Sequence, residues 1–336
     1  MKLSDILNVY NQEYDYHIDF LVLPQGKDKG NFTLGYCTEA YMRDLYVIEY
    51  LLNNFDLYSI FAKEKDMFIL QDAIGSVDIE KANITDLKLG LYKIGLNIPK
   101  GNKMLKNVHS LYKNEPIAIT EKNIIDNWNK VIRSCCGNSS IRGDKYRNGD
   151  VIVGGFRPIH YTDIQETYPN VVNELMNIEN PILRGILLHY VTAYYHPFCD
   201  GNGRTSRYLM RNEFAKMNKG LEVLPLSSYL YKDVLEYYSL FPTAIHSLTN
   251  DSFISYFCKL IKYILINKLI EKGLIEVDEK YKIAFNFIKK EGKVAKANIS
   301  YIEEYVEKLE LAQGLENLAL IGVVLETEYK YYTIKG

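Results

Sequence analysis

The 336-residue sequence is poor in cysteine and contains no long apolar run. Its cysteines are odd in number and lack C-x-x-C spacing, so neither a disulfide framework nor a zinc site is expected at Cys37, Cys135, Cys136, Cys199 and Cys258. No stretch of about 18 consecutive apolar residues occurs, and the N-terminal stretch has no basic segment followed by an apolar one. We therefore expect no membrane insertion and no secretion, and the cytoplasm as the location.

Net charge is also small, at −2, with 47% hydrophobic and 24% charged residues, which is typical of a soluble globular protein. Repeats and low-complexity stretches are absent, and the length suffices for two domains. The nine arginines are unevenly spread, because eight lie between residues 133 and 211. A guanidinium matches phosphate geometry, so this clustering indicates a nucleotide site. Compositional drift, which also explains 29 tyrosines, is the alternative.

The densest polar chemistry lies in residues 196–207, with the sequence HPFCDGNGRTSR. Before it, the apolar residues of 180–195 recur at helical intervals, which predicts a buried helix carrying His196 at its C-terminal end. Pro197 ends that helix. Residues 208–217 are helical again, so residues 200–204 are expected to form a tight turn at a helix N-terminus. Such a turn is an anion site.

The residue types in this turn suit phosphate. Gly201 and Gly203 let the backbone approach a ligand closely, and Arg204 and Arg207 share one helix face from which they can clamp successive phosphates. Asp200 would be repelled by a bare polyphosphate, which favours a role in holding Mg²⁺. His196 is the nearby group whose pKa suits proton acceptance from an attacking hydroxyl.

These residues resemble the Fic family signature H-P-F-x-[DE]-G-N-G-R-x-x-R at every specified position. The resemblance implies a Mg²⁺-dependent transfer of AMP from ATP to a Ser, Thr or Tyr hydroxyl of a target protein. It makes His196 the base and Phe198 the anchor of the loop. It further implies that Asp200 binds the metal, while the phosphates are held by Gly201, Asn202, Gly203, Arg204 and Arg207. Family members that transfer the γ-phosphate carry Lys where this chain has Gly201.

Ser76 and Glu80 lie four residues apart, and therefore on one helix face. They resemble the inhibitory motif of Fic proteins, [ST]-x-x-x-E-[GN], although Lys81 replaces the expected Gly or Asn. A solvated surface glutamate is the alternative, and we favour the inhibitory role. In the family this glutamate binds the second arginine of the signature, which is Arg207 in this chain.

Residues 151–156, VIVGGF, read as a short strand or hairpin. A family hairpin at this distance before the signature, the flap, holds the target segment as an added strand. Exposed backbone groups at a strand edge make that mode plausible. The flap residues would be Val151, Ile152, Val153, Gly154 and Gly155, and an ordinary hairpin is equally compatible.

The helical periodicity predicts a mainly α fold. The family resemblance implies a Fic-type helical bundle with a small β-hairpin flap, and the C-terminal pattern of three helices and a hairpin resembles a winged-helix domain. The expected divisions are residues 1–100 with the inhibitory helix, 101–270 as the catalytic core and 277–336 as the winged-helix-like part. Further helices are expected at 41–62, 103–114, 121–132, 169–178, 227–240, 253–270, 281–290, 298–307 and 312–321, with a hairpin at 323–334 and a loop at 24–31.

Alternative functions remain open from the residues alone. The same turn and metal would serve the reverse reaction, removal of AMP from a protein. A DNA-binding regulator acting through residues 277–336 is disfavoured, because that segment has no arginine and its candidate recognition helix has one glutamate and no base. The expected partner is thus a hydroxyl-bearing protein, with a homodimer left open and with neither nucleic acid nor membrane.

Overall fold

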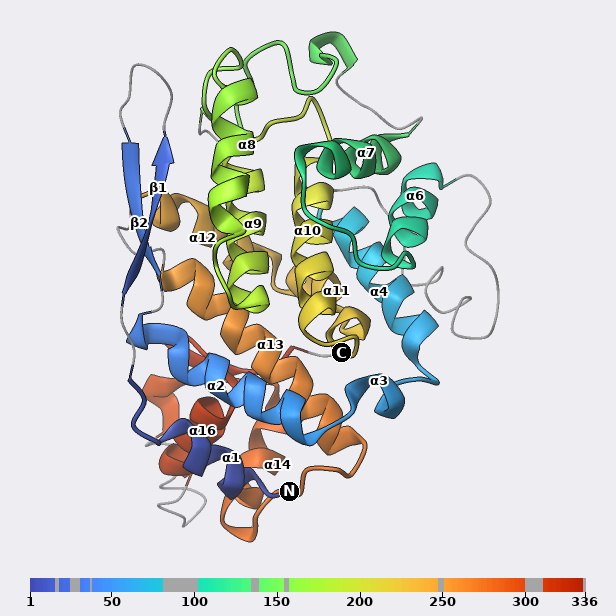
Figure 1. The fold of residues 1–336 in the computed structure, drawn as a ribbon. Coiled ribbons are helices and arrows are strands. Elements are labelled where there is room, and N and C mark those ends of the chain that lie inside the picture. Colours follow the sequence, from blue (N-terminus) through green and yellow to red (C-terminus); the bar gives the residue numbers. More distant parts are fainter. Residues whose placement is uncertain are drawn as a thin grey trace. The chain divides into compact units, whose positions relative to one another are not determined.

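The computed structural model describes residues 1–15, 18–24, 31–36, 38–80, 102–133, 139–153, 157–246, 251–299 and 311–334 (Figure 1). Helices dominate this described part, which confirms the predicted mainly α fold. The chain separates into two compact units. Unit 1 contains residues 1–17, 37–55 and 255–336, and unit 2 contains residues 18–36 and 56–254. No helix in the described ranges is long and apolar enough to cross a membrane.

Unit 2 is built around two adjacent helices, α9 (Pro181–Tyr195) and α10 (Asn202–Met217) (Figure 1). Gly185 allows their close approach, because a Cβ there would lie 3.0 Å from the carbonyl oxygen of Met210. The surrounding elements are α3 (Leu57–Ile60), α4 (Lys65–Asp78), α6 (Lys103–Tyr112), α7 (Glu121–Ile132), η1 (Ser139–Ile141), α8 (Ile164–Leu175), η2 (Leu221–Val223), α11 (Leu226–Lys232) and α12 (Val234–His246).

An antiparallel hairpin in unit 2, β1 (Asp19–Pro24) and β2 (Asn31–Tyr36), was not predicted from the sequence. It contacts α8, beside which it lies in Figure 1. Leu21 is buried, whereas Phe20 and Val22 are 68% and 49% exposed, so the strand alternates between faces with a period of two.

Helix boundaries differ from the predicted ones where local capping intervenes. The expected helix 41–62 is divided into α2 (Glu39–Asn54) and α3, because the Asp56 side chain accepts a hydrogen bond from the Ser59 amide and starts a new helix. The expected helix 227–240 is likewise divided into α11 and α12. Helix α8 begins at Ile164, earlier than expected, and contains Pro169.

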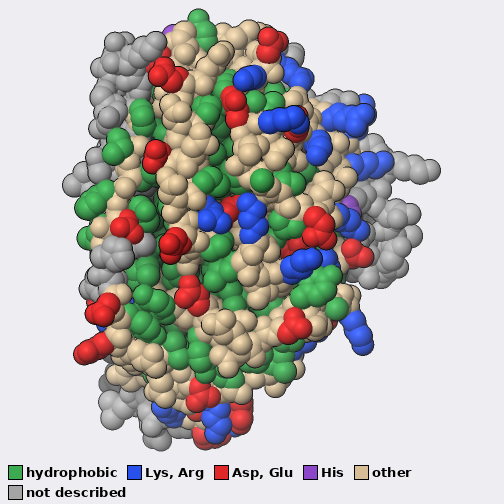
Figure 2. All heavy atoms as spheres, in the orientation of Figure 1, with side chains coloured by type: hydrophobic (Ala, Val, Ile, Leu, Met, Phe, Trp, Pro, Cys, Tyr) green, Lys and Arg blue, Asp and Glu red, His purple; other side chains and the backbone are tan. Residues whose placement is uncertain are grey.

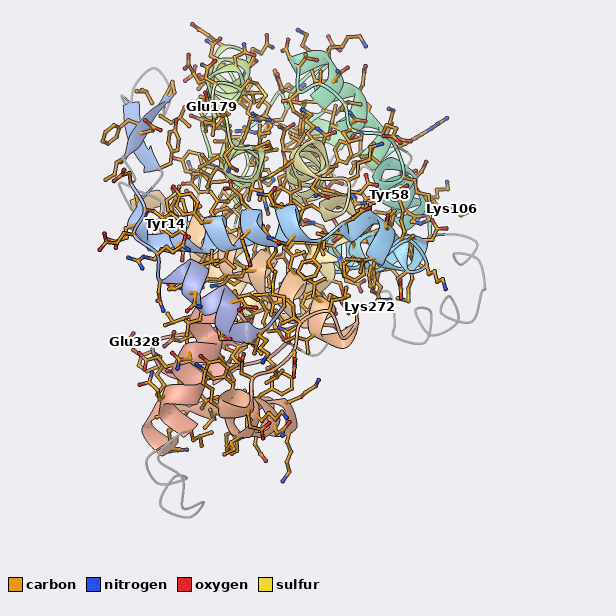
Figure 3. The ribbon with its side chains drawn as sticks, turned by 60° about the horizontal axis from the view of Figure 1, so that its bottom comes forward. Tyr14, Tyr58, Lys106, Glu179, Lys272 and Glu328 are labelled. Carbon is orange, nitrogen blue, oxygen red and sulfur yellow. The ribbon has the colours of Figure 1, made fainter. Side chains whose placement is uncertain are left out.

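Unit 1 combines helices with a three-stranded antiparallel sheet of order β3-β5-β4. The ring of Tyr14 stacks on that of Tyr46 of α2, with centroids 4.0 Å apart (Figure 3). Its elements are α1 (Leu3–Tyr10), α2, most of α13 (Asp251–Glu271), η3 (Glu279–Tyr281), α14 (Lys282–Glu291), β3 (Lys293–Ala295), η4 (Lys296–Asn298), α16 (Leu311–Ile321), β4 (Leu325–Glu326) and β5 (Lys330–Tyr332).

The predicted C-terminal hairpin corresponds to β4 and β5, to which β3 adds a third strand. Residues 300–310, which cover most of the helix expected at 298–307, lie outside the described residues. The winged-helix-like character of residues 277–336 therefore stays a prediction.

The molecular face drawn in Figure 2 carries Lys and Arg side chains interspersed with Asp and Glu among hydrophobic groups. This mixture agrees with the small net charge of the sequence. The face shown therefore presents no continuous field of one sign.

Candidate active site

The loop between α9 and α10 holds His196 in an unusual backbone conformation. The residue is the C-cap of α9, and its φ of 49° lies in the left-handed region, which residues other than glycine rarely adopt. Its carbonyl accepts a hydrogen bond from Nε of Arg147 at 2.9 Å, and the carbonyl of Pro197 accepts one from the Arg147 amide at 2.9 Å. These two bonds fix the backbone of His196 and Pro197, and with it the position of the imidazole.

Phe198 anchors the loop in the core, as the resemblance implied. It is fully buried, and its ring stacks on Trp128 of α7 with centroids 4.6 Å apart and planes at 10°. Trp128 also donates from Nε1 to the carbonyl of Asp200 at 2.8 Å. Asn202 closes the turn, because its side chain accepts from the Phe198 amide at 2.9 Å and donates to the Phe198 carbonyl at 2.8 Å. The Asn202 amide group thus binds the loop itself.

The turn then enters α10 at Asn202, which places Gly203 and Arg204 in its first turn and not in a preceding loop. Gly201 has φ of 77°, and a Cβ there would also lie 2.7 Å from a methyl carbon of Ile132. Glycine is therefore required on both conformational and steric grounds.

Arg204 is buried with part of its hydrogen-bonding capacity unused. Its Nη2 donates to Oδ1 of Asp200 at 2.7 Å, and the same oxygen accepts from the Gly201 amide at 2.5 Å. Its Nε and Nη1 are buried and have no hydrogen-bond partner within the described ranges. An unsatisfied buried cationic donor is costly, so this helix N-terminus has the chemistry of an anion site.

Arg207, in contrast, is bound by α4 and the residues that follow it. Its Nε donates to the Ser76 hydroxyl at 2.9 Å, and its Nη2 donates to the Ser76 carbonyl at 2.7 Å and to Oε1 of Glu80 at 2.9 Å. The arginine side chain is 1% exposed and that of Glu80 is 32% exposed. Gly203 makes room for the carboxylate, because a Cβ there would lie 2.2 Å from Oε1 of Glu80. Ser76 and Glu80 therefore meet at Arg207, and their inhibitory role stays a prediction.

Two further contacts, which the sequence analysis missed, fix α4 in place. Buried Asp72 accepts from the Ser227 amide at 2.5 Å and pairs with Arg211 at 3.4 Å. At Gly75 the helix approaches the backbone of α11 so closely that a Cβ would lie 2.4 Å from Ser227. A buried aspartate and a glycine within a helix are weak signals in sequence, since neither identifies its partner.

Burial lowers the pKa of His196 below its usual value, although the carbonyl of Ala193 and the charge of Glu80 oppose the shift. Its Nδ1 lies 3.3 Å from the Ala193 carbonyl oxygen. An Nδ1–H donated to that carbonyl would leave the lone pair on Nε2. A neutral imidazole with a free Nε2 can accept a proton.

Asp200 is the side chain that could hold Mg²⁺. A single carboxylate beside phosphate donors fits the way in which Mg²⁺ binds nucleotides, where phosphate oxygens and water supply the other ligands. The 24% exposure of its side chain leaves a carboxylate face accessible. Groups of three or more His, Cys, Asp or Glu suited to a metal are absent from the part of the chain that the structure describes.

The flap prediction is only partly covered by the structure. Val151 and Ile152 lie in no strand, and Val153 makes a single bridge. Gly154 and Gly155 lie outside the described residues, as does Lys81. The flap therefore stays a prediction.

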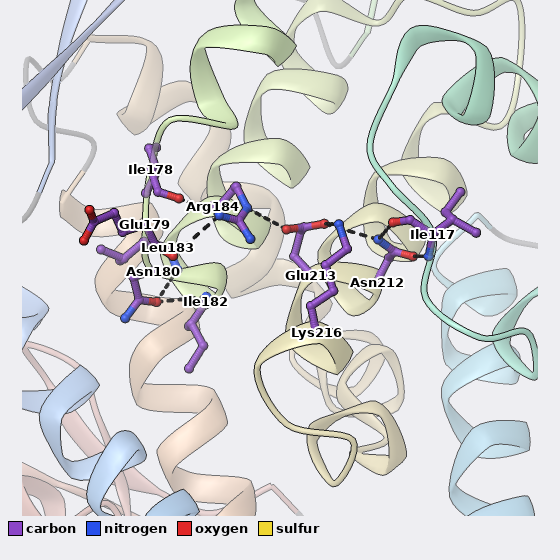
Figure 4. A network of polar contacts seen from close by, with 10 residues as sticks. All are labelled: Ile117, Ile178, Glu179, Asn180, Ile182, Leu183, Arg184, Asn212, Glu213 and Lys216. Atoms are coloured by element: carbon purple, nitrogen blue, oxygen red, sulfur yellow. Dashed lines mark hydrogen bonds and ion pairs between the residues drawn. The ribbon is translucent and has the colours of Figure 1, made fainter.

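The arginine cluster is less uniform than its density in sequence suggested. Arg184 of α9 binds Glu213 at 2.6 Å and the Ile178 carbonyl at 2.6 Å, in a network that Lys216 and Asn212 extend (Figure 4). Protein groups also bind Arg142, Arg147 and Arg211. In this structure Arg142, Arg147, Arg184 and Arg211 are therefore bound by protein groups, and the clustering does not make each arginine a phosphate ligand.

Comparison with known proteins agrees with this geometry. Residues 120–213 match the Fic/DOC family. Over 100 residues the chain is 34% identical to proteins named protein adenylyltransferase Fic from Drosophila mojavensis and Drosophila melanogaster. The match covers 29% of this chain and 19% and 20% of those proteins, so it spans about a fifth of these curated relatives.

A solved Fic family protein from Desulfovibrio desulfuricans G20 shares the fold, with a TM-score of 0.59 at 14% identity. The likeness covers 89% of this chain and 97% of that one. The family match includes the loop between α9 and α10. The chain therefore contains a Fic domain of the Fic/DOC family.

Proposed function

We propose that this protein transfers AMP from ATP to the hydroxyl of a Ser, Thr or Tyr side chain on a target protein. The observation that carries the proposal is the pairing of a half-buried imidazole of lowered pKa with the unsatisfied donors of Arg204. The first group can accept a proton and the second can bind an anion, and both lie within residues 196–204. The names of the similar proteins support this chemistry.

In the proposed reaction, the target oxygen bonds to the α-phosphorus as the bond from that phosphorus to the bridging oxygen of pyrophosphate breaks. The hydroxyl proton passes to Nε2 of His196, and pyrophosphate leaves. Backbone N–H groups of Asn202 and Gly203 and the guanidinium of Arg204 stabilise the phosphate charge. Asp200 would hold Mg²⁺, which when bound neutralises charge on the phosphate oxygens.

We further propose that Glu80 restrains this reaction. Arg207 is positioned to serve the terminal phosphate, yet Ser76 and Glu80 use its Nε and Nη2. Bound ATP would have to displace the carboxylate or place its γ-phosphate elsewhere. A displaced γ-phosphate turns the α-phosphorus away from the line of attack, and a misaligned substrate reacts slowly.

Transfer of label from ATP labelled at the α-phosphate to proteins of a cell lysate tests the proposal. We expect hydroxyl residues carrying AMP by mass spectrometry of labelled peptides, and no labelling by the His196→Ala variant. Equal labelling by both proteins would contradict it. Loss of AMP from modified proteins, with no transfer from ATP, would favour the reverse reaction.

A further inference from the structure

Arg147 joins the active-site loop to a second segment of unit 2. Its side chain is fully buried. Nε donates to the His196 carbonyl at 2.9 Å, Nη1 to the Gly149 carbonyl at 2.7 Å and Nη2 to the Ile159 carbonyl at 2.5 Å. One planar group therefore holds three carbonyls, and one of them belongs to the catalytic residue of the proposed function.

The two other carbonyls bracket the segment predicted to dock the target. Gly149 precedes Val151–Val153 and Ile159 follows them, so Arg147 fixes both ends of this segment. Asp150 adds further contacts between the two ends of this segment. Its Oδ1 accepts a hydrogen bond from the Tyr161 amide at 3.2 Å, and its Oδ2 lies 3.3 Å from Nε2 of His160. One guanidinium therefore binds the backbone at both Gly149 and Ile159.

A guanidinium suits this task because its donors have fixed directions within one plane. Moving either end of the segment away from Arg147 lengthens a charge-assisted hydrogen bond or moves the His196 peptide with it. The backbone of His196 is also strained, because its φ is 49°. A non-glycine residue in the left-handed region is strained and persists only where surrounding contacts fix it.

We propose that Arg147 is a positioning residue, which sets the distance between the His196 imidazole and the backbone on which the target segment docks. It would align the acceptor hydroxyl and leave nucleotide binding to Arg204 and the glycine turn. This inference rests on the proposed function. The competing explanation is a purely structural role, like that of Arg184, which binds Glu213 and a carbonyl away from the loop.

The test measures AMP transfer in trans in a Glu80→Gly background. The acceptor is the full-length His196→Ala chain, varied in concentration at saturating ATP. Arg147→Lys keeps the charge but loses the planar set of donors that binds three carbonyls. Arg184→Lys is the matched control, since Arg184 is only 15% exposed and also binds a carbonyl. For Arg147→Lys we expect at least a tenfold loss in kcat/KM for the acceptor. The Kd of ATP should stay within twofold, and amide hydrogen exchange should accelerate in residues 149–161.

Arg184→Lys should retain the acceptor kcat/KM within twofold, whatever it does to thermal stability. Parental kcat/KM in Arg147→Lys, or a loss matched by weaker ATP binding, would overturn the inference. If Arg147→Lys does not fold, Asp150→Ala is used instead, because it weakens the contacts between the same two segment ends. An unchanged acceptor KM in Asp150→Ala would then overturn the inference. If the Glu80→Gly parent binds ATP but transfers no AMP, the proposed function fails, and hydrogen exchange still tests the coupling between the two segments.

Discussion

Arg204 and Arg207 lie one turn apart on α10 but differ in what satisfies them. Arg204 has two buried nitrogens without partners in the described residues, whereas Ser76 and Glu80 bind Arg207. Both guanidiniums come from the same sequence signature. Their difference arises from α4, which lies far away in sequence, so the signature alone could not reveal it.

Replacing His196 with alanine should abolish AMP transfer and leave the Kd of ATP within about threefold. The imidazole acts on the acceptor hydroxyl, and the donors for phosphate lie on α10. Isothermal titration with ATP beside a labelling assay separates the two effects. A matched loss of binding and activity would instead assign His196 a role in holding the nucleotide.

The rate of transfer should stay nearly constant as the pH falls from 8 to about 6.5, and decline only below it. Burial lowers the pKa of His196 beneath its usual 6.5, so the imidazole stays neutral and able to accept a proton through this range. A labelling rate measured across pH at saturating ATP tests this. Half-loss of activity above pH 7 would mean that another group, or a raised pKa, governs the step.

Several contacts fix the middle and the C-terminal end of α4, the helix that leads to Glu80 and so to the proposed restraint. Asp72 and Gly75 attach its middle to α11, and Tyr238 of α12 donates to the Ile79 carbonyl at 2.9 Å, immediately before Glu80. Burial raises the pKa of Asp72, with the charge of Arg211 opposing the shift. The carboxylate of Glu80 thus reaches Arg207 from a fixed backbone.

Removing the Tyr238 hydroxyl should loosen that end and raise activity. We expect Tyr238→Phe to increase labelling by about two- to fivefold, which corresponds to about 0.4–1 kcal/mol, less than the loss of Glu80 itself. In the Glu80→Gly background the same substitution should have no further effect. Tyr231→Phe is the control, since Tyr231 is similarly exposed on the neighbouring helix. An additive gain in both backgrounds would show that Tyr238 acts independently of Glu80.

Much of the site could be predicted from sequence because its chemistry is contiguous. Residues 196–207 specify a helix end, a glycine turn and a helix start within one stretch, and the structure places them so. The strand pair β1–β2 could not be predicted, because its register depends on contacts with α8. Arg147 belongs to the arginine cluster that indicated a nucleotide site, yet its partners are carbonyls, and density in sequence cannot distinguish a carbonyl partner from a phosphate.

Unit 1 has its own buried charge pair, between Lys262 of α13 and Asp44 of α2. Lys262 also donates to the Leu320 carbonyl at 2.6 Å. Burial lowers its pKa, and Asp44 opposes that shift.

Asp44→Ala should lower the free energy of unfolding by about 3–5 kcal/mol, because it leaves a buried cation unpaired. Urea unfolding monitored by circular dichroism measures the loss. Glu271→Ala, which breaks an exposed pair with Lys268, should cost about 0–1 kcal/mol. Equal effects of the two changes would contradict the burial argument.

The most direct measurement compares automodification with ATP labelled at the α-phosphate by the full-length chain, Glu80→Gly and Asp66→Gly. Asp66 is the matched control, an acidic residue of α4 whose side chain is 73% exposed and pairs with Lys113. Loss of Glu80 frees Arg207 for the γ-phosphate, so labelling should rise by about tenfold or more, which needs about 1.4 kcal/mol of relieved misalignment. Asp66→Gly should label like the parent. Unchanged or reduced labelling by Glu80→Gly would contradict the account and make the Glu80–Arg207 pair a structural salt bridge.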